Sequence, residues 1–163
     1  MADDILHVLF VSAGNSSRSI MAEAMLNKLG RKNFLAFSAG ITPDGEVKSL
    51  ALDTLMQTGC DTSDLHVKSW DEFAAIQAPR IDAVILMEQE KFQGRFPIWF
   101  SNPVVVHWRI PPVEGPEMTD IECQYAYRRF FAELEQLMLR LAGLDLGHVR
   151  GYDLEISLNH IAP

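Results

Sequence analysis

The feature that most constrains the fold is an alternation of short apolar runs with amphipathic segments. Four runs of this kind are present, at residues 5–11, 34–38, 81–87 and 104–108. Short, nearly continuous apolar runs separated by helical segments are typical of parallel strands that are covered on both faces. The sequence therefore predicts a three-layer α/β fold, in which a four-stranded parallel sheet carries helices on both faces.

Helix signals occupy the segments between these runs. Apolar residues at helical spacing predict helices over 18–29 and around 47–55. Two capping boxes, Ser69 with Glu72 and Thr119 with Glu122, predict two further helix starts. Residues 144–163 have a mixed pattern that predicts no element, and residues 1–163 are expected to form one domain.

Composition narrows the function classes. The chain has 163 residues, 48% of them hydrophobic, and a net charge of −8, which argues against a broad nucleic-acid surface but allows a local anion site. No apolar run is long enough to span a membrane, and the start Met-Ala-Asp-Asp does not resemble a secretory signal, so we expect a cytoplasmic protein. The two cysteines, Cys60 and Cys123, form no CxxC motif, and we expect neither a metal site nor a cofactor.

The segment most suited to chemistry is residues 12–19, between the first apolar run and the first helix. Ligands bind at the carboxyl ends of parallel strands, and the free N–H groups of a helix start attract anions there. Gly14 and Asn15 tolerate left-handed backbone, and Arg18 supplies a planar, two-pronged donor. These residues predict an oxyanion site; the alternative is an ordinary polar turn with a serine cap.

The stretch from Val8 to Ala24 resembles the signature of the low-molecular-weight protein tyrosine phosphatases and the thioredoxin-coupled arsenate reductases. That family carries Cys-x5-Arg-Ser in this loop, with Gly-Asn-Ser inside it and Met-Ala-Glu after it. The segments Ser38-Ala39-Gly40 and His107-Trp108 match as well, so the resemblance extends from about Ile5 to Leu141. It implies the same α/β fold and an anion-binding loop made of Ser12, Ala13, Gly14, Asn15, Ser16, Ser17, Arg18 and Ser19.

The resemblance also assigns a role to each part of the loop. Residues 13–18 would donate backbone N–H groups to a phosphate-like ligand, and Arg18 would chelate two of its oxygens. Asn15 would brace the loop. Ser19 would cap the helix and steady Ser12.

The departures from the family pattern concern the chemistry. Ser12 stands where the family has its nucleophilic cysteine, and Ser17 replaces a second loop cysteine. Met87 and Gly94 align with the redox cysteines of the arsenate reductases, and Pro112 aligns with the general acid. A serine hydroxyl needs an adjacent base before it can attack, and proline transfers no proton.

Three functions therefore compete. The leading interpretation is a catalytically inactive relative that still binds phosphate, arsenate, sulfate or a phospho-ligand. The alternatives are an active phosphatase or arsenate reductase that uses Ser12, Glu114 or Glu117 in unfamiliar roles, and an interaction scaffold with a protein partner or a second copy. A serine engineered in place of a natural cysteine would be one change; the joint loss of nucleophile, redox pair and acid favours natural divergence.

The remaining residues of chemical interest are expected to be structural. Cys60 and Cys123 should be inert thiols, and His7 should be a structural residue of the first strand. Trp70 and Trp108 are expected to pack. Phe92, Phe96, Trp99 and Phe100 crowd a proline-bearing loop, where an exposed aromatic patch would suggest a partner surface.

Overall fold

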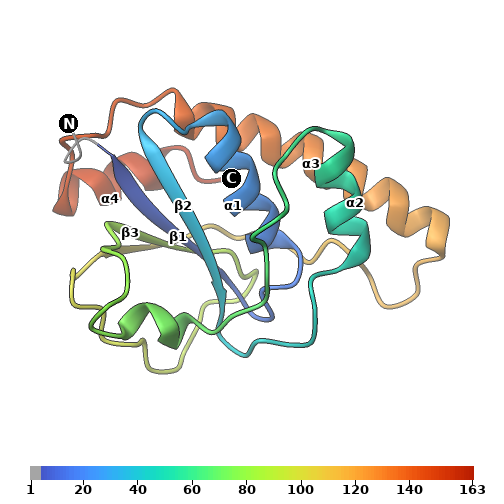
Figure 1. The fold of residues 1–163 in the computed structure, drawn as a ribbon, viewed down its shortest axis with the longest axis horizontal. Helices are drawn as coiled ribbons and strands as arrows, with labels where there is room; N and C mark the ends of the chain where they lie inside the picture. Colours follow the sequence, from blue (N-terminus) through green and yellow to red (C-terminus); the bar gives the residue numbers. More distant parts are fainter. Residues whose placement is uncertain (1–4) are drawn as a thin grey trace.

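The computed structural model describes residues 5–163. The expectation about a secretory signal depends on the first four residues, Met-Ala-Asp-Asp, and these lie outside the described residues. In chain order the elements are β1 (Leu6–Ser12), α1 (Arg18–Leu29), β2 (Phe34–Gly40), α2 (Ser49–Gln57), the 3-10 helix η2 (Trp70–Ala74), β3 (Ala83–Leu86), β4 (Val104–His107), α3 (Asp120–Ala142) and α4 (Gly151–His160) (Figure 1).

The four strands form one parallel sheet in the order β2-β1-β3-β4. The predicted fold class, a four-stranded parallel sheet with helices, is therefore confirmed. The chain leaves β1 toward β2 on one side and later returns to pair β3 on the other (Figure 1). The carboxyl end of β1 is consequently a topological switch point, where open α/β sheets leave a crevice for ligands.

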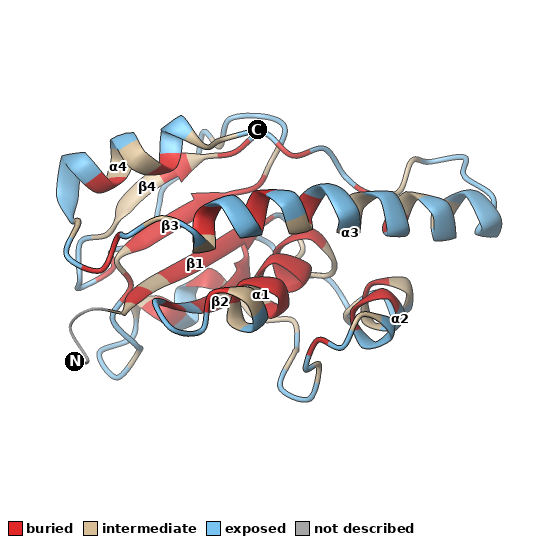
Figure 2. Cartoon of the chain, turned by 90° about the horizontal axis from the view of Figure 1, so that it is seen from above, coloured by how far each residue is buried: buried red, intermediate tan, exposed pale blue. Residues whose placement is uncertain are grey.

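The two faces of the sheet pack into two separate apolar clusters. Val8, Phe10 and Ile85 point toward α1, α3 and α4, and this side holds the larger cluster. The alternate residues Leu9 and Val84 point to the other face. In Figure 2, β1, β3 and the sheet-facing sides of α1 and α3 are coloured mainly as buried, and β4 is mainly intermediate. The first turns of α3 project beyond the sheet and are mainly exposed.

The second face is covered by η2 and by the aromatic loop after β3, and here the helix prediction needs correction. Ser69 accepts from the N–H of Asp71 rather than forming the expected capping box, and the helix is a short 3-10 turn. Its buried side chains are Trp70 and Phe73. A 3-10 turn aligns residues three apart, so one turn is enough to bury both aromatics against the sheet.

The C-terminal part of the chain contains two helices. The capping box predicted at Thr119 and Glu122 is confirmed at the start of α3. The tail that showed no clear pattern forms α4, whose Leu158 carbonyl accepts from the indole N–H of the fully buried Trp108 at 3.1 Å. None of the helices within residues 5–163 has the length and apolar character needed to cross a bilayer.

Candidate functional site

The loop after β1 turns its carbonyl groups away from the sheet crevice. A segment that follows β2, residues 41–48, donates backbone N–H groups to these carbonyls. The bonds run from Ile41 to Ser12 (3.0 Å), from Thr42 to Ala13 (2.8 Å), from Asp44 to Gly14 (3.3 Å) and from Lys48 to Ser16 (2.8 Å). Because the C=O and the following N–H of a trans peptide point in opposite directions, the N–H groups of residues 13, 14, 15 and 17 face the other way, toward the inside of the loop.

A close contact between this loop and the end of β2 depends on Gly40. A Cβ atom at Gly40 would lie 3.0 Å from the Ala13 carbonyl oxygen and 3.1 Å from Cβ of Asn15. The absence of a side chain therefore lets the end of β2 touch the loop. The sequence analysis recognised the Ser-Ala-Gly motif but not the bracing by residues 41–48, because these residues carry no periodic or motif signal.

Asn15 organises the inside of the loop. It is the loop's one non-glycine residue with left-handed backbone, at φ 55°, and it is fully buried. Its side chain donates to the Ser19 hydroxyl at 2.9 Å and accepts from the Lys68 N–H at 3.0 Å. This is the bracing geometry expected of Asn15. Gly14, which we expected to share the left-handed conformation, has no positive φ.

Ser12 lies at the bottom of the loop and is buried. Its hydroxyl hydrogen-bonds with the Ser19 hydroxyl at 2.7 Å and accepts from the Asn15 N–H at 3.2 Å. Ser19 thus steadies Ser12, but it does not cap α1: the N-cap position is Ser17, which makes no side-chain cap bond. Within residues 5–163 the hydrogen-bond partners of the Ser12 hydroxyl include no imidazole or carboxylate. His7 instead bonds through Nδ1 with the Arg80 carbonyl at 2.7 Å, in keeping with a structural role.

The Arg18 guanidinium extends from the start of α1 beneath the loop and is almost fully buried. One terminal nitrogen, NH1, donates to the carbonyls of Met87 and Ile110, each at 2.7 Å. These bonds connect α1 to the ends of β3 and β4 and hold the guanidinium in one orientation. They also commit NH1 to the protein itself, so that NH2 is the terminal nitrogen that reaches the Glu88 carboxylate.

Glu88, which the sequence analysis did not single out, faces Arg18. Its carboxylate oxygen Oε1 accepts from Arg18 NH2 at 2.9 Å and from the Ala13 N–H. Its backbone carbonyl hydrogen-bonds with His107 Nε2 on β4. The position of Glu88 in the sequence could have indicated this contact, because Glu88 follows β3, which pairs with β1, and so lies at the same edge of the sheet as the loop.

The loop between β4 and α3 contains Pro112, the residue for which the sequence resemblance implied the place of a general acid. Pro112 is exposed there and has no titratable group. Glu114 instead interacts with the hydroxyl of Tyr127, which also contacts the Ser17 side chain. Burial, followed by the contact with Glu114, raises the pKa of Tyr127, so this phenol remains a neutral hydrogen-bonding group that connects the two loops.

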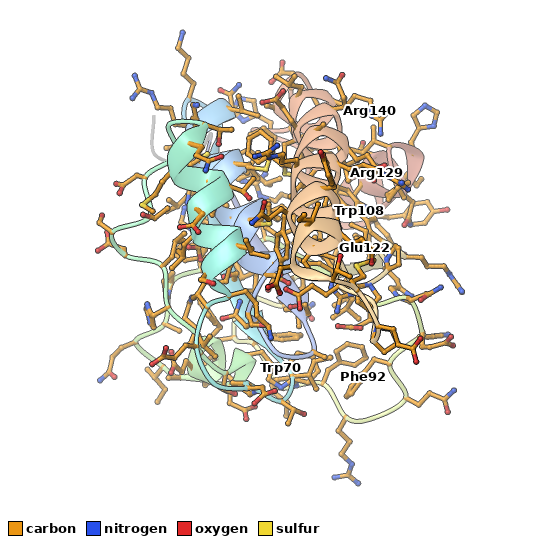
Figure 3. All side chains as sticks on the ribbon, turned by 90° about the vertical axis from the view of Figure 1, so that its right-hand side faces the viewer. Trp70, Phe92, Trp108, Glu122, Arg129 and Arg140 are labelled. Carbon is orange, nitrogen blue, oxygen red and sulfur yellow. The ribbon has the colours of Figure 1, made fainter. Side chains whose placement is uncertain are left out.

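A cavity of about 530 Å³ opens beside Ala13 and Glu88. Its wall includes Phe92 from the aromatic loop, together with the charged side chains of Lys91 and Arg109. Phe92 packs edge-on against Trp70 at 5.1 Å, and the two side chains lie together at the end of the molecule away from Arg140 (Figure 3). Trp70 and Trp108 are both buried, as expected, whereas Phe96 and Phe100 are exposed.

The two cysteines lie apart from the loop network. Cys60 is buried in the larger core cluster, and Cys123 is half-buried on α3. Burial and the neighbouring carboxylates, Glu114 first among them, raise the pKa of Cys123. A raised pKa suppresses the thiolate, which is the reactive form.

A largely buried ion pair supports the loop from the β2 side. Glu23 of α1 lies 3.7 Å from the Lys68 ammonium and accepts from the Ser38 hydroxyl at 3.0 Å. Burial raises the pKa of Glu23 and lowers that of Lys68, with the attraction between the two partly opposing both shifts. Because the Lys68 backbone holds Asn15, this pair is coupled to the loop.

The comparisons with known proteins agree with this architecture. The sequence model of the low molecular weight phosphotyrosine protein phosphatases matches residues 7–101. An arsenate reductase from Archaeoglobus fulgidus is 27% identical, with a TM-score of 0.66 over 84% of this chain and 99% of that one. A low molecular weight protein tyrosine phosphatase from T. tengcongensis is 26% identical, with a TM-score of 0.63 over 83% and 97%. An arsenate reductase in the phosphate binding state shares the fold at 22% identity, with a TM-score of 0.66 over 85% and 97%.

Proposed function

Because the chain belongs to the low molecular weight phosphotyrosine protein phosphatase family, we propose that it binds a phosphate-like oxyanion in the loop of residues 12–19 without turning it over. The observation that carries the proposal is the outward orientation of the loop carbonyls toward residues 41–48. It leaves converging N–H groups at the start of α1, where the helix dipole adds to the attraction for an anion. A solved relative of the same fold is an arsenate reductase in a phosphate binding state.

The surroundings of the Ser12 hydroxyl support the proposed lack of turnover. A serine hydroxyl is protonated at neutral pH and is a weak nucleophile unless a base removes its proton. The bonding partners of Ser12 are another hydroxyl and a backbone N–H, and neither is a base at neutral pH. Pro112, at the aligned acid position, cannot protonate a leaving group.

Arg18 provides the test of binding. We expect calorimetric titration with phosphate, arsenate and sulfate to detect binding to the wild type. Arg18→Ala should weaken it by about 1.5–3 kcal/mol, the usual contribution of a hydrogen bond to a charged group. Arg18→Lys should recover only part of the loss, because an ammonium lacks the planar fork of a guanidinium.

The matched control is Arg31→Ala, which removes the same charge from an exposed position just beyond α1. It should leave the affinity unchanged at moderate ionic strength, because salt screens distant surface charges. Equal affinities for Arg18→Ala and the wild type, or no binding of any of the three anions, would reject the proposed function. The scaffold interpretation would then be favoured.

A further inference from the structure

We propose that Glu88 is an internal anion that occupies the binding loop and that an oxyanion ligand must displace. This inference rests on the proposed function, because it concerns the occupancy of the same loop. Glu88 would then determine the affinity for the oxyanion, although it lies outside the signature stretch from Val8 to Ala24.

The contacts of the Glu88 carboxylate carry the argument. A single oxygen, Oε1, accepts both from the Ala13 N–H of the loop and from Arg18 NH2. A backbone N–H at the start of the loop and a guanidinium nitrogen are the donors that would hold one oxygen of a bound phosphate or arsenate. Oε1 therefore lies where a ligand oxygen would have to lie.

Electrostatics prevent the carboxylate and a ligand from sharing these donors. Arg18 is nearly buried and the Glu88 side chain is only 22% exposed, so charges there interact with little screening by solvent. A phosphate dianion next to the carboxylate would add like charges a few ångströms apart. Binding therefore requires Glu88 to leave, and the lost ion pair reduces the observed affinity.

The surroundings allow this exchange without rearranging the sheet. The Glu88 backbone is held through its carbonyl by His107, so only the side chain has to move. The adjacent cavity of about 530 Å³ has room for it, and Lys91 and Arg109 on the cavity wall can receive the displaced carboxylate. Arg18 keeps its two carbonyl partners throughout, which preserves the orientation of NH2.

The experiment measures inorganic phosphate affinity by calorimetry for the wild type, Glu88→Gln and Glu88→Ala. Alanine removes the internal acceptor entirely, whereas glutamine retains a neutral, weaker one. We expect the affinity to rise in the order wild type, Gln, Ala, and the alanine variant to gain on the order of tenfold to a hundredfold, as loss of a charge-assisted competitor implies.

Glu90→Gln is the control. Glu90 is exposed and lines the same cavity, but contacts neither Ala13 nor Arg18 through any bond among the described residues. It should leave phosphate affinity near that of the wild type. A second readout is thermal stability: without phosphate, Glu88→Ala should melt lower than the wild type, because Arg18 loses its carboxylate, and phosphate should restore more stability to the variant than to the wild type.

The outcomes separate this inference from the proposed function. Equal phosphate affinities for the wild type and both Glu88 variants would overturn the inference and leave the binding function intact. An equal gain in Glu90→Gln would also overturn it, because general charge removal would then suffice. Absence of phosphate binding in all variants, Glu88→Ala included, would overturn both.

Discussion

The two loops that meet at the start of α1 differ in how their side chains are held and in which groups they present. The β1–α1 loop retains Gly14, Asn15 and Arg18, and a dense set of hydrogen bonds holds it in place. The β4–α3 loop has an exposed Pro112 at the aligned acid position, and Glu114 is engaged with Tyr127. Under the proposed function, the geometry for holding an anion and the groups for breaking a bond to it diverge independently, because backbone N–H groups supply the first and side chains the second.

The largest expected effect comes from restoring chemistry to both loops. The wild type should hydrolyse aryl phosphates negligibly, since loss of a catalytic nucleophile can cost on the order of a millionfold in turnover. Ser12→Cys alone should restore only part of the rate. Adding Pro112→Asp should supply a further gain of about 10²–10⁴-fold, the usual contribution of a general acid.

Initial rates of aryl phosphate hydrolysis test this, with Pro112→Asp alone as the control that should remain at the wild-type level. Robust turnover by the unmodified protein, abolished by Ser12→Ala, would mean that the β1–α1 loop has kept its chemistry and that the contrast between the loops is wrong.

The Tyr127 hydroxyl connects the two loops, and its removal should have a smaller effect, on the stability of the fold. Tyr127→Phe removes the hydroxyl that contacts both Glu114 and Ser17. We expect the free energy of unfolding to fall by about 0.5–1.5 kcal/mol, the net contribution of a typical hydrogen bond. Denaturant unfolding measures it, and Tyr125→Phe, at an exposed position on the same helix, should have no effect. Equal losses in the two variants would show that the phenol does not connect the loops.

The Glu23–Lys68 ion pair beside the β1–α1 loop predicts that the stability of the fold depends on pH. The pKa of Glu23 is raised in the folded state above its ordinary value of 4.5, chiefly by burial. Between the two values the folded protein binds more protons than the unfolded chain, so this contribution to stability is full below the ordinary pKa and is lost as pH rises through the raised one. Unfolding measured across this window should show that loss in the wild type and its absence in Glu23→Gln.

Glu117→Gln, which removes an exposed carboxylate from the β4–α3 loop, should keep the wild-type pH profile. If Glu23→Gln kept that profile as well, the pH dependence would have to come from elsewhere in the protein.

The smallest expected effect is that of replacing the two cysteines, which should leave phosphate affinity unchanged. A Cys60→Ser/Cys123→Ser double variant should bind phosphate as the wild type does, because neither sulfur belongs to the loop network and the raised pKa of Cys123 suppresses its thiolate. Calorimetry under reducing and oxidising conditions tests it. A Cys60–Cys123 disulfide that altered phosphate affinity would contradict the inert-thiol assignment.

The elements with local signals were predicted well. The run before Ser12 became β1, the predicted helix over residues 18–29 is α1 with the same bounds, and the Thr119–Glu122 capping box begins α3. Errors arose where local signals conflicted with packing. Ser69 and Glu72 form a capping-box pattern, yet two buried aromatics at a spacing of three residues produce a 3-10 turn.

The sequence by itself determined the sheet, the first helix and the position of Arg18, because apolar periodicity and the loop motif act over neighbouring residues. Only the tertiary structure decided what the loop contacts. Residues 41–48 orient the carbonyl groups of the loop, and Glu88 accepts from the loop's Ala13 N–H. Both contacts arise because β1 pairs in parallel with β2 and with β3, which brings the carboxyl ends of the three strands together. Contacts between residues so distant along the chain depend on strand order, and strand order is a property of the folded sheet.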